Sequence, residues 1–240
     1  KIPSSFSVDK KWQEWCLVRK KKYPIVLDKY KIPNKHSVNP YSFVEELTTI
    51  LDDDAVIVAA NGSACVVLFQ AGVVKFGQRF IWNSGCASMG YALPASIGAT
   101  LAANRDVICI TGDGSIQMNL QELQTVIEYD LPIKLFVLNN DGYESIRVSQ
   151  KNYFNNRLIG ESNKSGVSFP DTLKVAKAYG IKAVKIRNYQ ELERKLDGIL
   201  NFDKAVIIDV IMPRDQPIVP TVSSIVNPDG TMSSRPLEDM

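Results

Sequence analysis

Short runs of apolar residues, rich in valine and isoleucine, recur along the chain from residue 55 onward. They are apolar on both faces, as expected of strands in a parallel sheet covered by helices. We predict strands at residues 55–60, 107–111, 133–138, 182–186 and 205–211. Stretches with apolar residues at helical spacing, or rich in small residues, predict helices at residues 88–103, 116–127, 172–179 and 189–200. This alternation predicts an α/β fold: an open, mostly parallel β-sheet with helices on both faces.

The two ends of the chain follow different patterns. Residues 9–22 alternate tryptophans and other apolar side chains with lysines, which predicts a short helix with one apolar stripe. The prolines of residues 23–40 indicate an extended linker, and those beyond residue 213 indicate irregular structure. We therefore predict three parts, namely a helix and linker at residues 1–37, the main domain at residues 38–215 and an irregular tail at residues 216–240.

The composition is that of a globular protein, with 45% hydrophobic and 22% charged residues among 240. These values exclude a disordered tail, a collagen and a coiled coil. No apolar run approaches the roughly 18 residues of a membrane helix. The net charge of +2 hides an asymmetry, because residues 1–36 hold ten Lys and Arg against three Asp and Glu, and the rest holds 18 against 23. We expect neither nucleic-acid nor membrane partners for the main body.

The four cysteines are irregularly spaced and form no CxxC pair, which favours reduced thiols and a cytoplasmic location. The chain starts at Lys1 rather than at a methionine, and no signal peptide pattern follows. We therefore expect a piece of a longer protein.

Polar tetrapeptides follow two of the predicted strands, Gly-Asp-Gly-Ser at residues 112–115 and Asn-Asn-Asp-Gly at residues 139–142. Ligands of open α/β sheets bind outside the carboxyl ends of strands. Asp113 and Asn140 are about one strand–helix–strand unit apart, so neighbouring strands would bring them to one edge. A carboxylate, an amide oxygen and a turn carbonyl suit Mg²⁺, which usually shares its coordination shell with phosphates. The glycines and the start of the next helix favour a phosphate group there.

Other interpretations fit each tetrapeptide taken alone. The first also suits a strand-to-helix turn capped by Ser115, and the second suits a simple turn. A non-catalytic nucleotide-binding or regulatory α/β domain is an alternative, although the chain has neither GxGxxG after a strand nor a Walker motif. A further alternative is an assembly module with a vestigial cofactor site. Metal-dependent cofactor binding separates both from the first interpretation.

Gly-Asp-Gly at residues 112–114, followed by Asn-Asn at residues 139–140, resembles the signature of thiamine diphosphate-dependent enzymes. The segment SGCASMGYALPASIGA at residues 84–99 resembles the sequence before that motif in acetolactate synthase-like members. The resemblance covers essentially the whole chain. Residues 38–215 match the C-terminal domain that binds the cofactor diphosphate, and residues 1–37 look like the end of the preceding central domain and a linker.

The resemblance implies roles for individual residues. Asp113, the side-chain oxygen of Asn140 and the backbone carbonyl of Gly142 would bind Mg²⁺. Met89 would prop the cofactor into its bent shape, with nearby backbone such as Ala87 beside it. The other residues that would bind the cofactor or face its substrate are Gly62, Ser63, Ala64, Gly112, Gly114, Ser115, Tyr143, Glu144 and Ser145.

The activity implied is decarboxylation or carboligation of 2-oxo acids with thiamine diphosphate and Mg²⁺ as cofactors. No catalytic residue is implied within this chain, because the family's activating glutamate belongs to an N-terminal pyrimidine-binding domain, usually of a partner subunit. We therefore expect the chain to be inactive alone and its protein to form a homodimer or homotetramer. Whether FAD occupies the central domain, and whether the chain is truncated or naturally split, stay open.

The sequence departs from acetolactate synthases proper after the paired asparagines. Those enzymes carry Gly-Met and then Gln-Trp, whereas Val148 and Ser149 occupy the Gln-Trp positions here. This departure argues against acetolactate as the product and leaves the 2-oxo acid open. We interpret Arg147 and Lys151, which follow the same motif, as a solvated helix face rather than as contacts to a substrate carboxylate.

Overall fold

A computed structural model of the chain describes residues 9–32, 36–222 and 224–236. The chain forms two compact units. One unit is Asp28–Pro217, which contains the main sheet and all the helices that cover it. The other consists of the described parts of Lys1–Leu27 and Ile218–Met240.

Six parallel strands form the main sheet in the order β2-β1-β3-β4-β6-β5. Their bounds are β1 Val56–Ala59, β2 Arg79–Trp82, β3 Val107–Gly112, β4 Ile133–Asn139, β5 Lys182–Ile186 and β6 Val206–Ile211. The four inner strands are buried almost throughout, whereas the edge strands β2 and β5 are largely half-buried. The parallel sheet confirms the predicted fold class.

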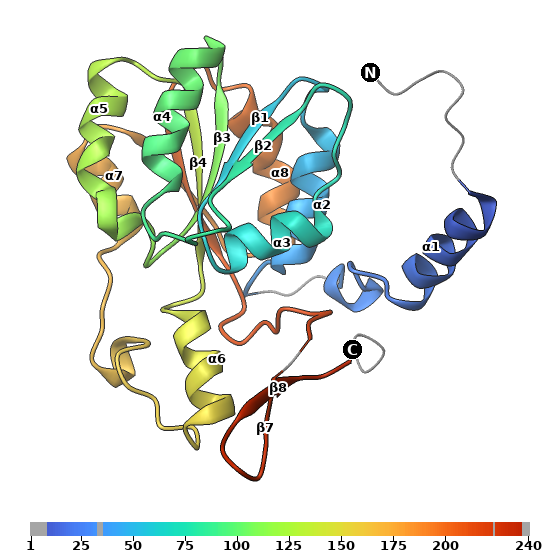
Figure 1. The fold of residues 1–240 in the computed structure, drawn as a ribbon. Helices are drawn as coiled ribbons and strands as arrows, with labels where there is room; N and C mark the ends of the chain where they lie inside the picture. The colour runs from blue at the N-terminus through green and yellow to red at the C-terminus, as the bar shows by residue number, and fades with distance from the viewer. Residues whose placement is uncertain (1–8, 33–35, 223, 237–240) are drawn as a thin grey trace. The chain divides into compact units, whose positions relative to one another are not determined.

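Helices cover both faces of this sheet (Figure 1). The helices of this unit are α2 Pro40–Ile50, α3 Ser63–Ala71, α4 Ala92–Ala103, α5 Leu123–Glu128, α6 Glu144–Tyr153, α7 Thr172–Ala178 and α8 Tyr189–Leu200, with 3₁₀ helices η1 Asp28–Tyr30, η2 Ile116–Glu122 and η3 Asn163–Ser165. Of these, α6 lies beyond the carboxyl ends of the strands and not on a face of the sheet (Figure 1). Right-handed crossovers place α4, α5 and α7 on one face. They place α3 and α8 on the other, where α2 packs against α3.

Local sequence explains where the helices begin. In α2 the side chain of Asn39 accepts a hydrogen bond from the Tyr41 N–H (2.9 Å), and Pro40 occupies the first helical position. Asp171 caps α7 in the same way, accepting hydrogen bonds from the N–H groups of Leu173 and Lys174. These caps hold each helix start at a fixed point next to the sheet.

Several elements differ from those predicted. The sequence patterns missed β2 and α3, and they gave no bounds for α6, although Arg147 and Lys151 were expected on a helix face. The helix predicted at residues 88–103 begins only at Ala92, after a turn in which Gly90 has φ of 83°. The helix predicted at residues 116–127 is η2 followed by α5, with a kink at Asn119, whose side chain donates a hydrogen bond to the Gly90 carbonyl (3.0 Å).

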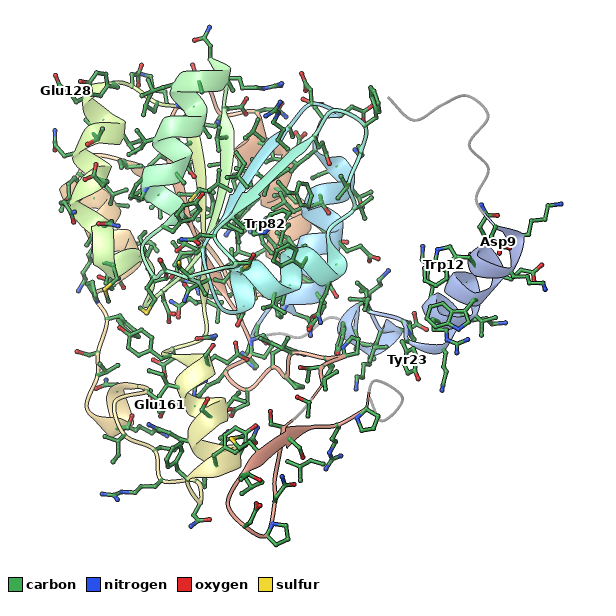
Figure 2. The ribbon with its side chains drawn as sticks, in the orientation of Figure 1. Asp9, Trp12, Tyr23, Trp82, Glu128 and Glu161 are labelled. Atoms are coloured by element: carbon green, nitrogen blue, oxygen red, sulfur yellow. The ribbon has the colours of Figure 1, made fainter. Side chains whose placement is uncertain are left out.

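The second unit contains α1 Lys10–Lys22 and an antiparallel hairpin of β7 Ser224–Val226 and β8 Met232–Ser234. The predicted helix is present, but all of α1 is exposed, and Trp12 stacks on Trp15 at 5.2 Å (Figure 2). The prediction of an irregular tail is wrong for β7 and β8, because a turn closed between Asn227 and Thr231 pairs the two strands. Within the described ranges, no helix has the length and apolar character needed to cross a membrane.

Candidate functional site

The candidate site lies at the carboxyl ends of β1, β3 and β4. β1 leads into α3 on one face of the sheet, whereas β3 leads into η2 and α5 on the opposite face. This reversal opens a crevice of the kind where α/β sheets bind ligands. A cavity there is lined by thirteen of the fourteen predicted residues, namely Gly62, Ser63, Ala64, Met89, Gly112, Asp113, Gly114, Ser115, Asn140, Gly142, Tyr143, Glu144 and Ser145.

The fourteenth residue, Ala87, does not line this cavity. It is exposed and lies in a turn with φ of 48°. Three lining residues, Asn61, Leu138 and Ile146, were missed by the sequence analysis. Asn61 directly precedes Gly62 at the end of the first strand region, so its position at a strand end was the available signal.

Asp113 directly follows β3 and is buried, with 6% of its surface exposed. Its Oδ1 accepts a hydrogen bond from the Gly114 N–H (2.9 Å), and its Oδ2 accepts one from the Gly142 N–H (3.1 Å). Burial raises the pKa of Asp113 to about 6, although both backbone hydrogen bonds favour the ionised form. A cation beside this carboxylate would supply the opposite charge that its surroundings lack.

Asn140 follows β4, whose last residues pair in register with the end of β3. Its side-chain Nδ2 donates a hydrogen bond to Oε2 of Glu144 (3.1 Å). Its Oδ1 is buried and accepts no hydrogen bond from any residue that the structure describes. A buried amide oxygen without a partner is unfavourable by itself and suits a metal ligand.

Gly114 and Gly142 leave no room for a side chain. A Cβ on Gly114 would collide with the ring of Tyr143, which also packs edge-on against Phe169 with centroids 5.1 Å apart. Gly142 has φ of 143°, and a Cβ there would collide with the carbonyl oxygen of Glu161. The backbone beside Asp113 is therefore held between these neighbouring segments.

The other side of the cavity is formed by the start of α3. Ser63 and Ala64 are its first two residues, after Gly62 with φ of 58°. The first N–H groups of a helix lack partners within it and suit phosphate oxygens. The Ser63 hydroxyl donates a hydrogen bond to Oε2 of Glu144, so this side is linked to the Asn140 side.

Ser115 ties together three segments at the end of β3. Its hydroxyl donates to Oδ1 of Asn61 (2.9 Å) and accepts from the Gly90 N–H (3.0 Å). The Ser115 hydroxyl, which was predicted to contact a diphosphate, therefore already has two hydrogen-bond partners within the chain.

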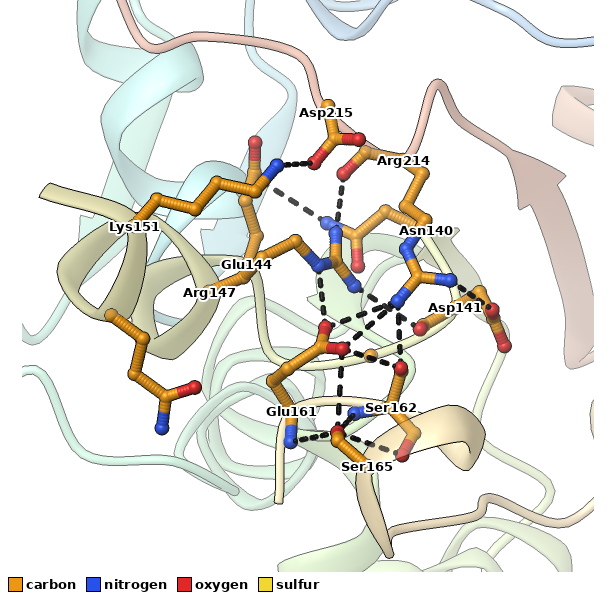
Figure 3. Close-up of polar contacts among 12 residues, drawn as sticks. Asn140, Asp141, Glu144, Arg147, Lys151, Glu161, Ser162, Ser165, Arg214 and Asp215 are labelled. Carbon is orange, nitrogen blue, oxygen red and sulfur yellow. Dashed lines mark hydrogen bonds and ion pairs between the residues drawn. The ribbon is translucent and has the colours of Figure 1, made fainter. Parts of the chain in front are cut away.

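A buried ionic cluster, which we call the Glu161 cluster, lies against the loop of residues 139–142 (Figure 3). It consists of Arg147, Glu161, Ser162, Ser165 and Arg214. Nε of Arg147 donates to Oε2 of Glu161 at 2.5 Å, and both side chains are 1% exposed. Arg147 also donates to the carbonyl oxygens of Asp141 (3.2 Å) and Arg214.

The interpretation of Arg147 as part of a solvated helix face is wrong. Its guanidinium is buried because Glu161, 14 residues later, supplies the opposite charge that makes such burial possible. Lys151, one turn further along α6, is exposed as predicted and pairs with Asp215 at 2.7 Å.

Glu161 stays ionised at the centre of the cluster. Burial alone would raise its pKa, but hydrogen bonds from Ser162 and Arg147 and the charges of Arg147 and Arg214 lower the pKa to about 2. The cluster therefore fixes the end of the 139–142 loop with permanent charges, and the Glu161 carbonyl accepts a hydrogen bond from the Tyr143 N–H (2.8 Å).

The oxygen atoms of this site suit a divalent cation that prefers oxygen ligands. Asp113 provides a carboxylate, Asn140 an unpartnered amide oxygen and Gly142 a backbone carbonyl in the same lining. In the described part of the chain no cluster of three His, Cys, Asp or Glu could hold a metal ion.

The fold and the site together define a cofactor-binding α/β domain with its ligand cavity at a switch point of the sheet. The chain belongs to the thiamine pyrophosphate enzymes, because residues 60–210 match the model of their C-terminal TPP-binding domain. The predicted resemblance is thereby confirmed.

Acetolactate synthase large subunits are among the relatives of this chain. The chain is 36% identical to that of Cyanidium caldarium over 65% of this chain and 27% of the relative. It is 32% identical to that of Porphyra purpurea over 88% and 35%, respectively. The isozyme 2 large subunit of Escherichia coli is 36% identical over 68% and 28%. The matched region is thus about a third or less of each relative's length, and the chain is a C-terminal domain resembling theirs.

Proposed function

We propose that this chain binds the diphosphate of thiamine diphosphate through Mg²⁺, held by Asp113, Asn140 and the carbonyl of Gly142. The observation that carries the proposal is the unpartnered, buried Oδ1 of Asn140 in the same cavity as the buried carboxylate of Asp113. The start of α3, with Ser63 and Ala64, would receive the phosphate oxygens.

Thiamine diphosphate supplies the carbanion chemistry by which 2-oxo acids are decarboxylated or ligated. The residues of this chain bind and orient it. Asp113 and Asn140 hold the cation, the segment at Met89 supports the cofactor, and Tyr143 packed on Gly114 closes the wall of the cavity. The remainder of the chemistry needs the pyrimidine-binding domain with its activating glutamate, which this chain does not supply.

The whole protein is then a lyase or transferase acting on a 2-oxo acid, resembling acetolactate synthase and assembled as a homodimer or homotetramer in the cytoplasm. The isolated chain would bind cofactor without turning over substrate. Val148 and Ser149, which replace the Gln-Trp pair of acetolactate synthases proper, support a substrate pair different from theirs.

Calorimetric titration with thiamine diphosphate, with and without Mg²⁺, tests the proposal. We expect binding that requires Mg²⁺ and is lost in Asp113→Ala. Asp203→Ala, which changes an exposed aspartate before β6, is the matched control and should bind as the unaltered chain does. Metal-independent binding, or equal binding by Asp113→Ala, would contradict the proposed site and favour a vestigial or regulatory domain.

A further inference from the structure

Glu144 is a buried carboxylate inside the cavity, at the first position of α6 (Figure 3). It is 8% exposed. Its Oε2 accepts hydrogen bonds from Nδ2 of Asn140 (3.1 Å) and from the Ser63 hydroxyl. Burial of a carboxylate is unfavourable unless hydrogen bonds or an opposite charge compensate for the lost hydration.

The side-chain amide of Asn140 carries the donor Nδ2 and the acceptor Oδ1 on opposite sides of one carbon. A hydrogen bond that fixes Nδ2 therefore also fixes the direction in which Oδ1 points. The Glu144 carboxylate can only accept a hydrogen bond from an uncharged amide. The reverse orientation would bring Oδ1 against a negative charge and turn the NH₂ group toward the cation. Glu144 therefore selects the orientation in which Oδ1 is left without a partner in the described chain.

We propose that Glu144 is a positioning residue that orients Oδ1 of Asn140 toward the bound cation. This inference rests on the proposed function, since it concerns the same metal site. Groups that orient metal ligands through hydrogen bonds typically contribute about 10- to 100-fold to metal affinity.

Glu144 also connects the two sides of the cavity. Through Ser63 it is joined to the start of α3, and through Asn140 it is joined to the end of β4. The hydrogen bond from Ser63 holds the Glu144 carboxylate beside Asn140. We therefore expect a change at Glu144 to weaken Mg²⁺-dependent cofactor binding through its effect on Asn140.

The first experiment compares Glu144→Ala and Glu144→Gln by calorimetric titration with thiamine diphosphate in the presence of Mg²⁺. We expect the alanine variant to bind about 10- to 100-fold more weakly. The glutamine variant should stay within a few-fold of the unaltered chain, because its amide oxygen still accepts from Asn140. Glu128→Ala, at an exposed glutamate of α5 (Figure 2), is the control and should not change the affinity.

A double-mutant cycle then separates positioning from direct contact. If Glu144 acts through Asn140, adding Glu144→Ala to Asn140→Ala should cause no further loss of affinity. Fully additive losses, or a glutamine variant as weak as the alanine variant, would show that the charge of Glu144 itself meets the ligand and would overturn the inference. Absence of binding by the unaltered chain would instead overturn the proposed function, and this inference with it.

A measurement without any ligand keeps the inference testable if Glu144→Ala does not fold. In the NMR spectrum of the ligand-free chain, the side-chain NH₂ of Asn140 should be protected from exchange with water. Glu144→Gln should preserve that protection. Exchange of this NH₂ at the rate of an exposed asparagine would overturn the inference.

Discussion

At the scale of single residues, Gly114 shows how a missing methyl group shapes the cavity. The Tyr143 ring lies where a Cβ of residue 114 would be, and Phe169 supports that ring from its edge. The ring and the backbone after β3 are consequently in direct contact, which keeps the turn beside Asp113 in one conformation.

Gly114→Ala should destabilise the protein by about 1–3 kcal/mol, because a close-packed site must shift to admit the new group. Gly198→Ala is the matched control, because position 198 lies in the exposed part of α8 with no neighbouring atom within 4 Å of the new Cβ. That change should instead stabilise the helix by up to about 1 kcal/mol. Urea unfolding of both variants measures the difference, and equal stabilities would contradict the packing described here.

Asp171, the N-cap of α7, makes the stability of the protein depend on pH. Backbone hydrogen bonds from Lys174 and Leu173 lower the pKa of Asp171 below its ordinary value of 3.8. Because the folded-state pKa is lowered, the stability that ionised Asp171 contributes is present above pH 3.8 and is lost as the pH falls through the folded pKa.

We therefore expect Asp171→Ala to reduce stability at pH 7 by about 1 kcal/mol. Asp171→Asn keeps a capping oxygen but has no titrating group. When the pH is lowered from 5 to 3, the free energy of unfolding should therefore fall less in this variant than in the unaltered chain. Unfolding by urea across that range is the measurement. Parallel pH profiles for the unaltered chain and the asparagine variant would contradict the assignment.

At the scale of elements, the Glu161 cluster joins four segments of chain. Arg147 belongs to α6, Glu161 and Ser162 to the loop after it, Arg214 to the segment after β6, and Asp141 to the loop after β4. The loop at the candidate metal site is thus fixed by charges on three other segments.

Glu161→Gln should be strongly destabilising, by about 3–5 kcal/mol, because it leaves the buried Arg147 without its counter-charge. Lys151→Ala removes an exposed ion pair on the same helix and should change stability by less than about 1 kcal/mol. Thermal or urea unfolding compares the two. A small effect of Glu161→Gln would mean that Arg147 finds other compensation.

The sequence patterns predicted the inner strands and the amphipathic α8, and they missed elements whose patterns conflict with their structure. β2 is a largely half-buried, four-residue edge strand with only three consecutive apolar residues, at positions 80–82. α3 is rich in valine and other strand-forming residues, and its helical form depends on burial against α2 and the sheet. α6 is mostly polar, so the sequence indicated a helix face at Arg147 and Lys151 but neither the bounds of the helix nor the burial of Arg147.

The candidate site was more predictable than the elements around it. Strand-end positions in the sequence indicated Asp113 and Asn140, and the family resemblance supplied the other residues. Thirteen of the fourteen residues named in these two ways line one cavity. The partners of those residues were not visible. The sequence gives no sign that Glu161 pairs with Arg147. It also gives no sign that Glu144 accepts a hydrogen bond from Ser63, 81 positions away.

At the scale of the whole molecule, burial sorts the four thiols into two groups. Cys16 and Cys86 are exposed, and Cys65 and Cys109 are buried. Burial raises the pKa of Cys109 to about 12 and also raises that of Cys65, so the thiolate form is disfavoured at both.

We expect two thiols to react rapidly with a chromogenic disulfide reagent at pH 8 in the native chain, and two more only on unfolding. Cys16→Ser with Cys86→Ser should remove the rapid phase and leave the slow one. The rate of the slow phase should rise with urea in step with global unfolding. Rapid labelling of Cys109 without denaturant would contradict its place in the interior of β3.

The register between β3 and β4 decides whether the cavity can form. Gly112 is paired with Leu138, which brings the Asp113 and Asn140 turns to the same level. A slip of one residue would turn every side chain of a strand to the opposite face and separate the two turns. Only chains that have completed the correct pairing would then form the cavity, so a ligand of this cavity would stabilise the correctly paired chain over the slipped one.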